Sequence, residues 1–80
     1  MAMKAETYET SDIALASYLY CSGVQLVRID RQNPHRCLFI FNSPKPDLIS
    51  KWQEGKAVVN ALAFHNAYQE LKARLFRGET

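Results

Sequence analysis

The alternation of apolar and polar residues breaks down in one short stretch of this chain. Residues 37–41, Cys-Leu-Phe-Ile-Phe, are apolar at every position. A strand with one solvent-exposed face alternates between apolar and polar residues, whereas an unbroken apolar run is typical of a strand covered on both faces. The pattern therefore raises the question of what covers Phe39 and Phe41 in a chain of 80 residues.

A second predicted strand, residues 24–31, in which Val24, Leu26, Val27 and Ile29 dominate, precedes this one and is separated from it by the turn signal Asn33-Pro34-His35. The two strands predict an antiparallel hairpin. A loop with an even number of residues makes the residue numbers of each cross-strand pair add to an odd total, and this register decides which side chains share a face.

The predicted register gives the hairpin one aliphatic face and one aromatic face. The aliphatic face, which we expect to be the core face, holds Val27, Ile29, Leu38 and Ile40. The opposite face holds Leu26, Arg28, Asp30, Cys37, Phe39 and Phe41.

A helix is predicted before the hairpin, from the N-cap residue Ser11 to about Cys21. Asp12 falls in its first turn, and Gly23 supplies the left-handed residue that ends it. Apolar residues occupy more than one face of this helix. It should therefore be buried on more than one side, or it should meet a partner.

Two more helices are predicted after the hairpin. The first begins near Pro46 and ends at Gly55, and the second is capped by Asn60 and runs from Ala61 to about Phe76. Steps of three and four residues define the apolar stripe of the last helix: Phe64, Ala67, Tyr68, Leu71 and Leu75. We expect Phe64 and Leu71 to pack against the aliphatic face of the hairpin.

A short stretch with strand propensity, residues 6–10, could pair at a sheet edge. The element order is then β-α-β-β-α-α, which predicts an α+β fold with helices packed on a hairpin-centred antiparallel sheet. We expect a single domain over residues 1–80, with an ordered core over about residues 7–76.

Charge is modest and unevenly distributed. The formal net charge is +2. Residues 1–27 carry Lys4 against Glu6, Glu9 and Asp12, a net −2, and residues 28–80 carry nine Lys or Arg against five Asp or Glu, a net +4. A polyanionic partner is therefore compatible with the composition but is not required by it.

The cysteine count and the absence of a visible signal peptide or membrane-spanning run favour a cytoplasmic protein with reduced thiols. Zinc-type residues are Cys21, His35, Cys37 and His65, but they lack zinc-ligand spacing. No nucleophile–base motif, paired carboxylate motif or glycine-rich phosphate loop is present. We therefore expect no enzyme activity, no metal, no cofactor and no small-molecule substrate.

The most specific chemistry on this sequence is that of a nucleic-acid surface. RNA-binding sheets present aromatic rings on one strand face beside basic side chains. The candidate residues for such a face, or for a protein partner, are Arg28, Arg31, Arg36, Phe39 and Phe41. The alternative is structural, with the first helix or a second subunit covering both phenylalanines.

Several caps, glycines and core aromatics also resemble a family of small bacterial and phage-associated domains of unknown function. The matching features span about residues 7–76: Thr10-Ser11-Asp12 at a helix start, Gly23, Phe39 with Phe41, Gly55, and Asn60 before Phe64. The resemblance implies a shared fold. It supplies no activity and no catalytic or binding residues.

The sequence thus predicts a non-enzymatic binding module, with a nucleic-acid-associated accessory role as the first hypothesis. The alternative is a protein-interaction or homo-oligomerising adaptor without nucleic-acid contact. A protein partner or self-association is expected in either case, because the apolar first helix and the two phenylalanines are more apolar surface than a short chain easily hides.

Overall fold

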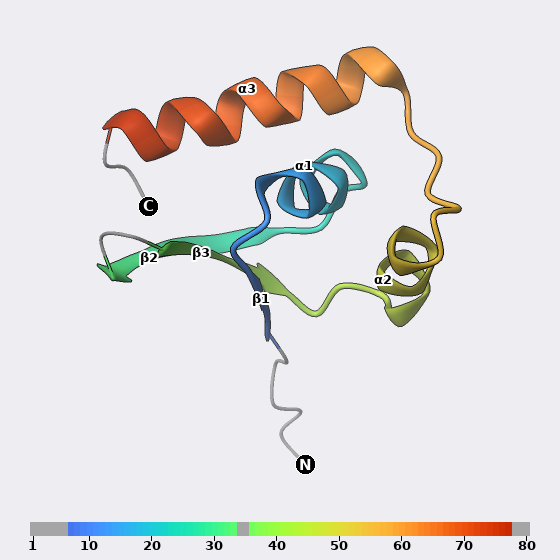
Figure 1. Ribbon diagram of the computed structural model, residues 1–80, viewed down its shortest axis with the longest axis horizontal. Helices are drawn as coiled ribbons and strands as arrows, with labels where there is room; N and C mark the ends of the chain where they lie inside the picture. Colours follow the sequence, from blue (N-terminus) through green and yellow to red (C-terminus); the bar gives the residue numbers. More distant parts are fainter. Residues whose placement is uncertain (1–6, 34–35, 78–80) are drawn as a thin grey trace.

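The computed structural model describes residues 7–33 and 36–77, and within them the element order is the predicted β-α-β-β-α-α (Figure 1). The fold is therefore α+β, as the sequence pattern indicated. The elements are β1 (Thr7–Thr10), α1 (Ile13–Cys21), β2 (Leu26–Asn33), β3 (Arg36–Asn42), α2 (Pro46–Gln53) and α3 (Ala61–Arg77).

The strands form one antiparallel sheet in the order β1-β3-β2. β3, which contains the apolar run of residues 37–41, is the central strand. β1 and β2 are edge strands, and the short polar stretch before α1 does pair at the sheet edge, as expected.

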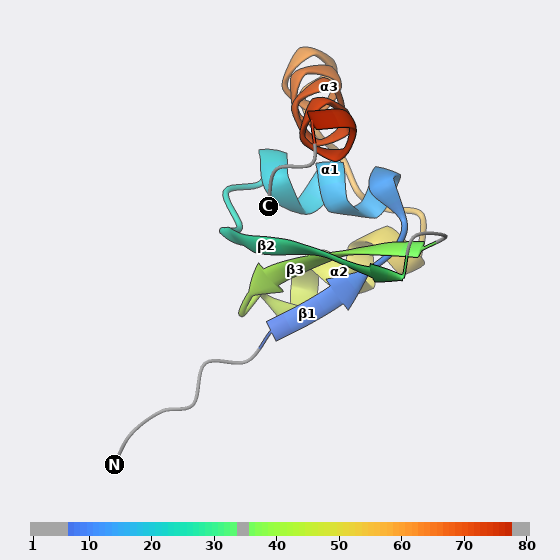
Figure 2. The same cartoon turned by 90° about the vertical axis from the view of Figure 1, so that its left-hand side faces the viewer.

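The helices form two further layers over one face of the sheet. α1 lies directly on the sheet, and α3 crosses over the opposite side of α1 (Figures 1 and 2). α2 lies at the end of the sheet, where β3 ends. It joins the core through Trp52, whose ring stacks on Tyr18 of α1 with centroids 5.3 Å apart and an interplanar angle of 28°.

α1 is buried on both sides because it lies between the sheet and α3. Leu15, Ala16, Ser17, Tyr18 and Leu19 are all buried, although consecutive residues of a helix point in different directions. Ser17 remains compatible with this environment because its hydroxyl donates a hydrogen bond to the Ile13 carbonyl at 2.7 Å. The apolar residues on several faces of this helix are therefore explained within one chain.

The ends of the helices follow the local signals closely, with one shift. Asp12, rather than the expected Ser11, is the N-cap of α1, and its carboxylate accepts from the Ala14 N–H at 2.9 Å. Gly23 and Gly55 have positive φ and terminate α1 and α2 as predicted. Asn60 caps α3 by accepting from the Ala63 N–H at 3.0 Å.

The predicted hairpin register is wrong by one residue. Leu26 pairs with Phe41, but Arg28 pairs with Ile40 and Ile29 with Phe39, so Val27 is an extra residue in a β-bulge. A slip of one residue exchanges the two faces of a strand. Ile29 therefore lies beside Phe39 on the core face, and Arg28 lies on the opposite face with Ile40.

The bulge has a clear physical reason. The regular register would have placed the Arg28 side chain beside Phe39, under α1, where an unpaired charge is costly to bury. The bulge instead leaves Val27 48% exposed and puts Ile29 in the core at 1% exposure. The expected core face, Val27 and Ile29 with Leu38 and Ile40, is thus not formed.

The expected position of the last helix also needs correction. Leu71 is fully buried and belongs to the same core cluster as Phe39 and Phe41, whereas Phe64 is only half-buried at its margin. α3 packs mainly on α1 and not on the aliphatic side of the hairpin. No helix in the described part of the chain has the length and hydropathy needed to cross a membrane.

We expect Leu71→Ala to lower the free energy of unfolding by about 2–5 kcal/mol, because it opens a cavity at a fully buried position. Leu62→Ala makes the same chemical change on the same helix at a site that is 67% exposed. It should alter stability by less than about 0.5 kcal/mol. Urea unfolding followed through Trp52 fluorescence measures both. Equal losses would contradict the docking of α3 through Leu71.

Candidate functional site

Phe39 and Phe41 do not form an exposed aromatic face. Their exposed fractions are 1% and 0%, and they pack in the cluster that contains Leu15 and Leu19 of α1. The first helix is therefore the cover that this apolar strand requires. Of the two interpretations that the sequence left open, the structure therefore has the one in which the first helix covers both rings, and the Val27 bulge places Ile29 rather than Arg28 beside Phe39.

Two of the three arginines of the predicted face, Arg28 and Arg31, lie apart from each other. Arg28 lies on the opposite side of the sheet, with its guanidinium 3.6 Å from the Asp30 carboxylate. Arg31 donates a hydrogen bond to the Arg74 carbonyl of α3 at 2.7 Å, so it ties the edge strand to the outer helix. The side chain of Arg36 lies outside the described residues. Arg28 and Arg31 are therefore not brought together with the two phenylalanines.

The sheet face that points away from α1 is mixed in character rather than basic. Arg28 and Asp30 of β2 flank the central Ile40, and Glu9 of β1 pairs beside Ile40 from the other edge. None of the described helices covers this face (Figure 2). Ile40 is nevertheless only 3% exposed. The central aliphatic residue of this face is therefore covered, and the charged residues named on this face are one arginine and two carboxylates.

An apolar groove lies between edge strand β1 and helix α2. We call it the β1–α2 groove; its volume is about 340 Å³, and its lining residues are Thr7, Tyr8, Ser43, Pro44, Pro46, Ile49 and Ser50. Its walls are largely carbon, whereas Thr7, Ser43 and Ser50 bring hydroxyl groups. A concave apolar site with a few polar groups is the usual form of a ligand pocket.

Local backbone chemistry shapes this groove. Ser43 follows β3 with φ of 46°, a left-handed conformation that is uncommon outside glycine. Pro44 then keeps the chain out of helical geometry at Ser43, and Pro46 begins α2. The reversal brings the start of α2 alongside β1. The proline pair after β3 was the available sequence signal, but the sequence alone did not indicate which strand it would face.

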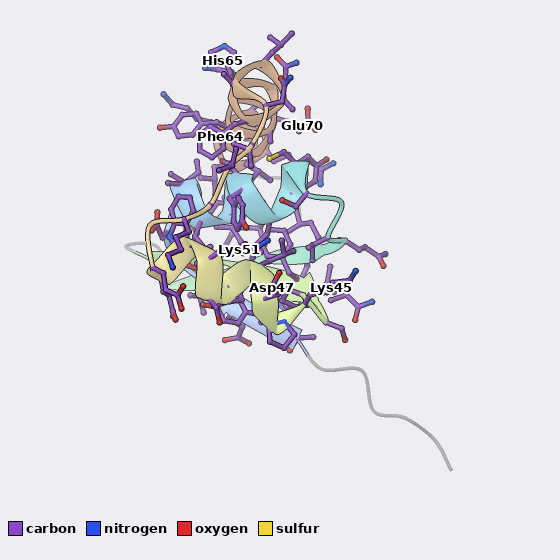
Figure 3. All side chains as sticks on the ribbon, turned by 90° about the vertical axis from the view of Figure 1, so that its right-hand side faces the viewer. Lys45, Asp47, Lys51, Phe64, His65 and Glu70 are labelled. Atoms are coloured by element: carbon purple, nitrogen blue, oxygen red, sulfur yellow. The ribbon has the colours of Figure 1, made fainter. Side chains whose placement is uncertain are left out.

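A second, more polar cleft lies on the other side of the Ser43–Lys45 turn. Its volume is about 510 Å³, and it is lined by Ser22, Gly23, Val24, Gln25, Asn42, Ser43, Lys45 and Leu48. Lys45, Asp47 and Lys51 surround this end of α2 (Figure 3), and Asp47 and Lys51 form an ion pair at 3.3 Å. Most polar groups here face solvent, so the cleft is a weaker candidate than the groove.

The residues considered for metal chemistry are dispersed. Within residues 7–33 and 36–77 there is no cluster of three or more His, Cys, Asp or Glu side chains that could hold a metal ion. His35 lies outside the described residues, and His65 projects from α3 on the side away from α1 (Figure 3). Cys21 and Cys37 are both free thiols.

Burial raises the pKa of the Cys21 thiol, and the thiol also donates a weak hydrogen bond to the Tyr18 carbonyl at 3.4 Å. Because the thiolate is the reactive species, a raised pKa lowers the reactive fraction at a given pH. Cys21 at the end of α1 is therefore a poor nucleophile near neutral pH.

We expect alkylation of Cys21 in a Cys37→Ser variant to reach half its maximal rate at a higher pH in the folded protein than in urea. The raised pKa keeps the folded thiol protonated over the interval in which the unfolded thiol already ionises. Iodoacetamide rates measured against pH in both states provide the test. Coincident midpoints would contradict the effect of burial, whereas reduced access alone would lower the rate without moving the midpoint.

Comparison with known proteins identifies the chain at the level of a family. Residues 5–77 match the family described as a domain of unknown function, DUF5659. No curated protein and no solved structure matches the chain. The family match includes every described helix and strand, from β1 to α3. The chain therefore belongs to the DUF5659 family of small domains of unknown function.

Proposed function

We propose that this domain is a non-enzymatic binding module that takes up an extended segment of a partner protein along β1. The observation that carries the proposal is the β1–α2 groove, an apolar pocket located directly beside an open sheet edge. The proposal favours the protein-interaction alternative over the nucleic-acid one. It includes a cytoplasmic location in a bacterial or phage setting, with which two free cysteines are compatible.

The open edge supplies the affinity in this proposal. β1 pairs with β3 on one side, and no other described strand pairs with its outer side. The outward backbone N–H and C=O groups of an edge strand can form a ladder with an added strand. Several peptide-binding domains use this mode, in which backbone hydrogen bonds hold the peptide and adjacent pockets choose its side chains.

The groove supplies the specificity. Tyr8, Pro44, Pro46 and Ile49 offer an apolar wall to one aliphatic or aromatic side chain of the added segment. Proline and tyrosine lose little conformational freedom when a ligand covers them, which lowers the entropic cost of binding. The hydroxyl groups of Thr7 and Ser50 can meet polar atoms of the same segment.

Nucleic-acid association has less support. The two phenylalanines that would stack on bases are buried, and Arg28 and Arg31 are engaged with Asp30 and with the Arg74 carbonyl. Stacking on exposed aromatic rings is what gives single-strand binders much of their affinity.

The proposal is tested with a displayed library of random nine-residue peptides, followed by titration of one selected peptide. We expect selected peptides to share an apolar anchor and to bind with micromolar affinity. Ser50→Arg should weaken binding at least tenfold, because a long charged side chain enters the groove from an exposed position. Amide shifts in nuclear magnetic resonance spectra should concentrate in Thr7–Thr10.

The matched control is Gln53→Arg, which adds the same charge at another exposed position of α2 that does not line the groove. It should leave the affinity within about twofold, and both variants should melt like the parent. Failure to enrich any peptide, or equal binding to the Ser50→Arg variant, would overturn the proposal. Binding of a single-stranded oligonucleotide that weakens steeply with salt would instead revive the nucleic-acid hypothesis.

A further inference from the structure

Apolar side chains are exposed where α2 leads into α3. The link from Glu54 to Asn60, which we call the connection, contains Val58 at 91% exposure and Val59 at 36%. Leu62, in the first turn of α3, is 67% exposed. None of these three side chains belongs to the buried core cluster, and their exposed apolar surface lies within five residues, where a partner surface could cover it.

The backbone of the connection is extended and bonded only at its ends. The Lys56 N–H donates to the Lys51 carbonyl at 2.8 Å, and the Asn60 carbonyl accepts from the Phe64 N–H at 2.9 Å. Between these points Ala57, Val58 and Val59 form no backbone hydrogen bond with any described residue. The connection can therefore change direction without loss of a hydrogen bond of its own.

A change in the direction of the connection would move α3, which follows it directly. α3 packs mainly on α1, through the fully buried Leu71 and through Arg74, which lies over the Tyr20 ring at 5.9 Å. At about 1.5 Å per residue, the 17 residues of α3 extend about 25 Å and the nine residues of α1 about 13 Å. Because α3 crosses α1 at a steep angle, both of its ends extend beyond the crossing point (Figures 1 and 2).

We propose that α3 is exchanged between two copies of this chain, so that each α3 packs on the α1 of the other copy. Every contact that holds α3 in the single chain is made again in this dimer, including the hydrogen bond from Arg31 to the Arg74 carbonyl. The interface is thus one whose complementarity is already present in the structure. The proposal is independent of the β1–α2 groove, which lies on different residues.

The size of the exposed patch argues for exchange over simple docking. A stable interface usually involves about 20–30 residues on each side, and Val58, Val59 and Leu62 are too few. Exchange adds the entire α1–α3 contact twice. It also brings the two connections together around the dimer axis, where the β-branched Val58 and Val59 favour pairing as short antiparallel strands. That pairing would cover the exposed valines and bond their free backbone groups.

The test is refolding of the parent chain from urea at about 1 mM, where association competes with folding of single chains. We expect a dimer by light scattering. Mixing isotope-labelled and unlabelled copies before refolding should then give intermolecular nuclear Overhauser contacts between the Leu71 methyl groups and Leu15 or Leu19. A parent that is strictly monomeric, or a dimer whose Leu71 contacts remain within one copy, would overturn the proposal.

Two changes to the connection sharpen the result. Deletion of Val58 and Val59 shortens the connection by up to about 7 Å, which should hinder packing of α3 on its own α1 and raise the dimer fraction at least fivefold. Insertion of four Gly or Ser residues after Val59 should lower it. A deletion variant that folds but stays monomeric would also contradict exchange. If the deletion variant does not fold, the Leu71 contacts measured on the parent chain decide whether α3 is exchanged. Contacts that map to β1 would indicate edge pairing instead.

Discussion

Phe39 and Phe41 project from the central strand against α1, and both rings are almost completely removed from solvent. Burial of one such side chain contributes about 1.5–3 kcal/mol, a large part of the stability of a small domain. Because these rings pack against α1, the side of α1 that faces the sheet must be apolar. Its other side is apolar too, and exposure of that side would cost a comparable amount. The outer helix α3 is therefore required by the same contact.

Val27 determines which face of the hairpin takes part in this contact. The regular alternation of β2 would have turned Ile29 away from Phe39 and Arg28 toward it. With Val27 as one extra residue, Ile29 faces Phe39 and Arg28 faces the other side, while Val27 itself is exposed. The same bulge disturbs the outer edge of β2, and irregular edges resist further pairing. Edge pairing is thus less hindered at β1, which has four residues and no bulge.

Signals carried by single residues predicted the elements well. Gly23, Gly55 and Asn60 mark helix ends through their own backbone or side-chain chemistry, and each was identified correctly from the sequence. The faces could not be predicted in the same way. Whether a bulge forms depends on which register gives the more favourable core, with Ile29 or with Arg28 beside Phe39. The residues next to Val27 in the sequence do not indicate that choice. The groove between β1 and α2 depends on residues about 40 positions apart, such as Tyr8 and Ile49.

The layering limits where this domain can meet another molecule. The inner face of the sheet and both sides of α1 are occupied within the chain. The outer sheet face carries the charged side chains of Arg28, Asp30 and Glu9, and its central Ile40 is buried. Among the described residues, two surfaces with apolar character lie at boundaries between elements, namely the β1–α2 groove and the connection before α3. Recognition at such boundaries relies on backbone pairing and a few side-chain anchors, which suits an extended or exchanged segment better than a flat, preformed surface.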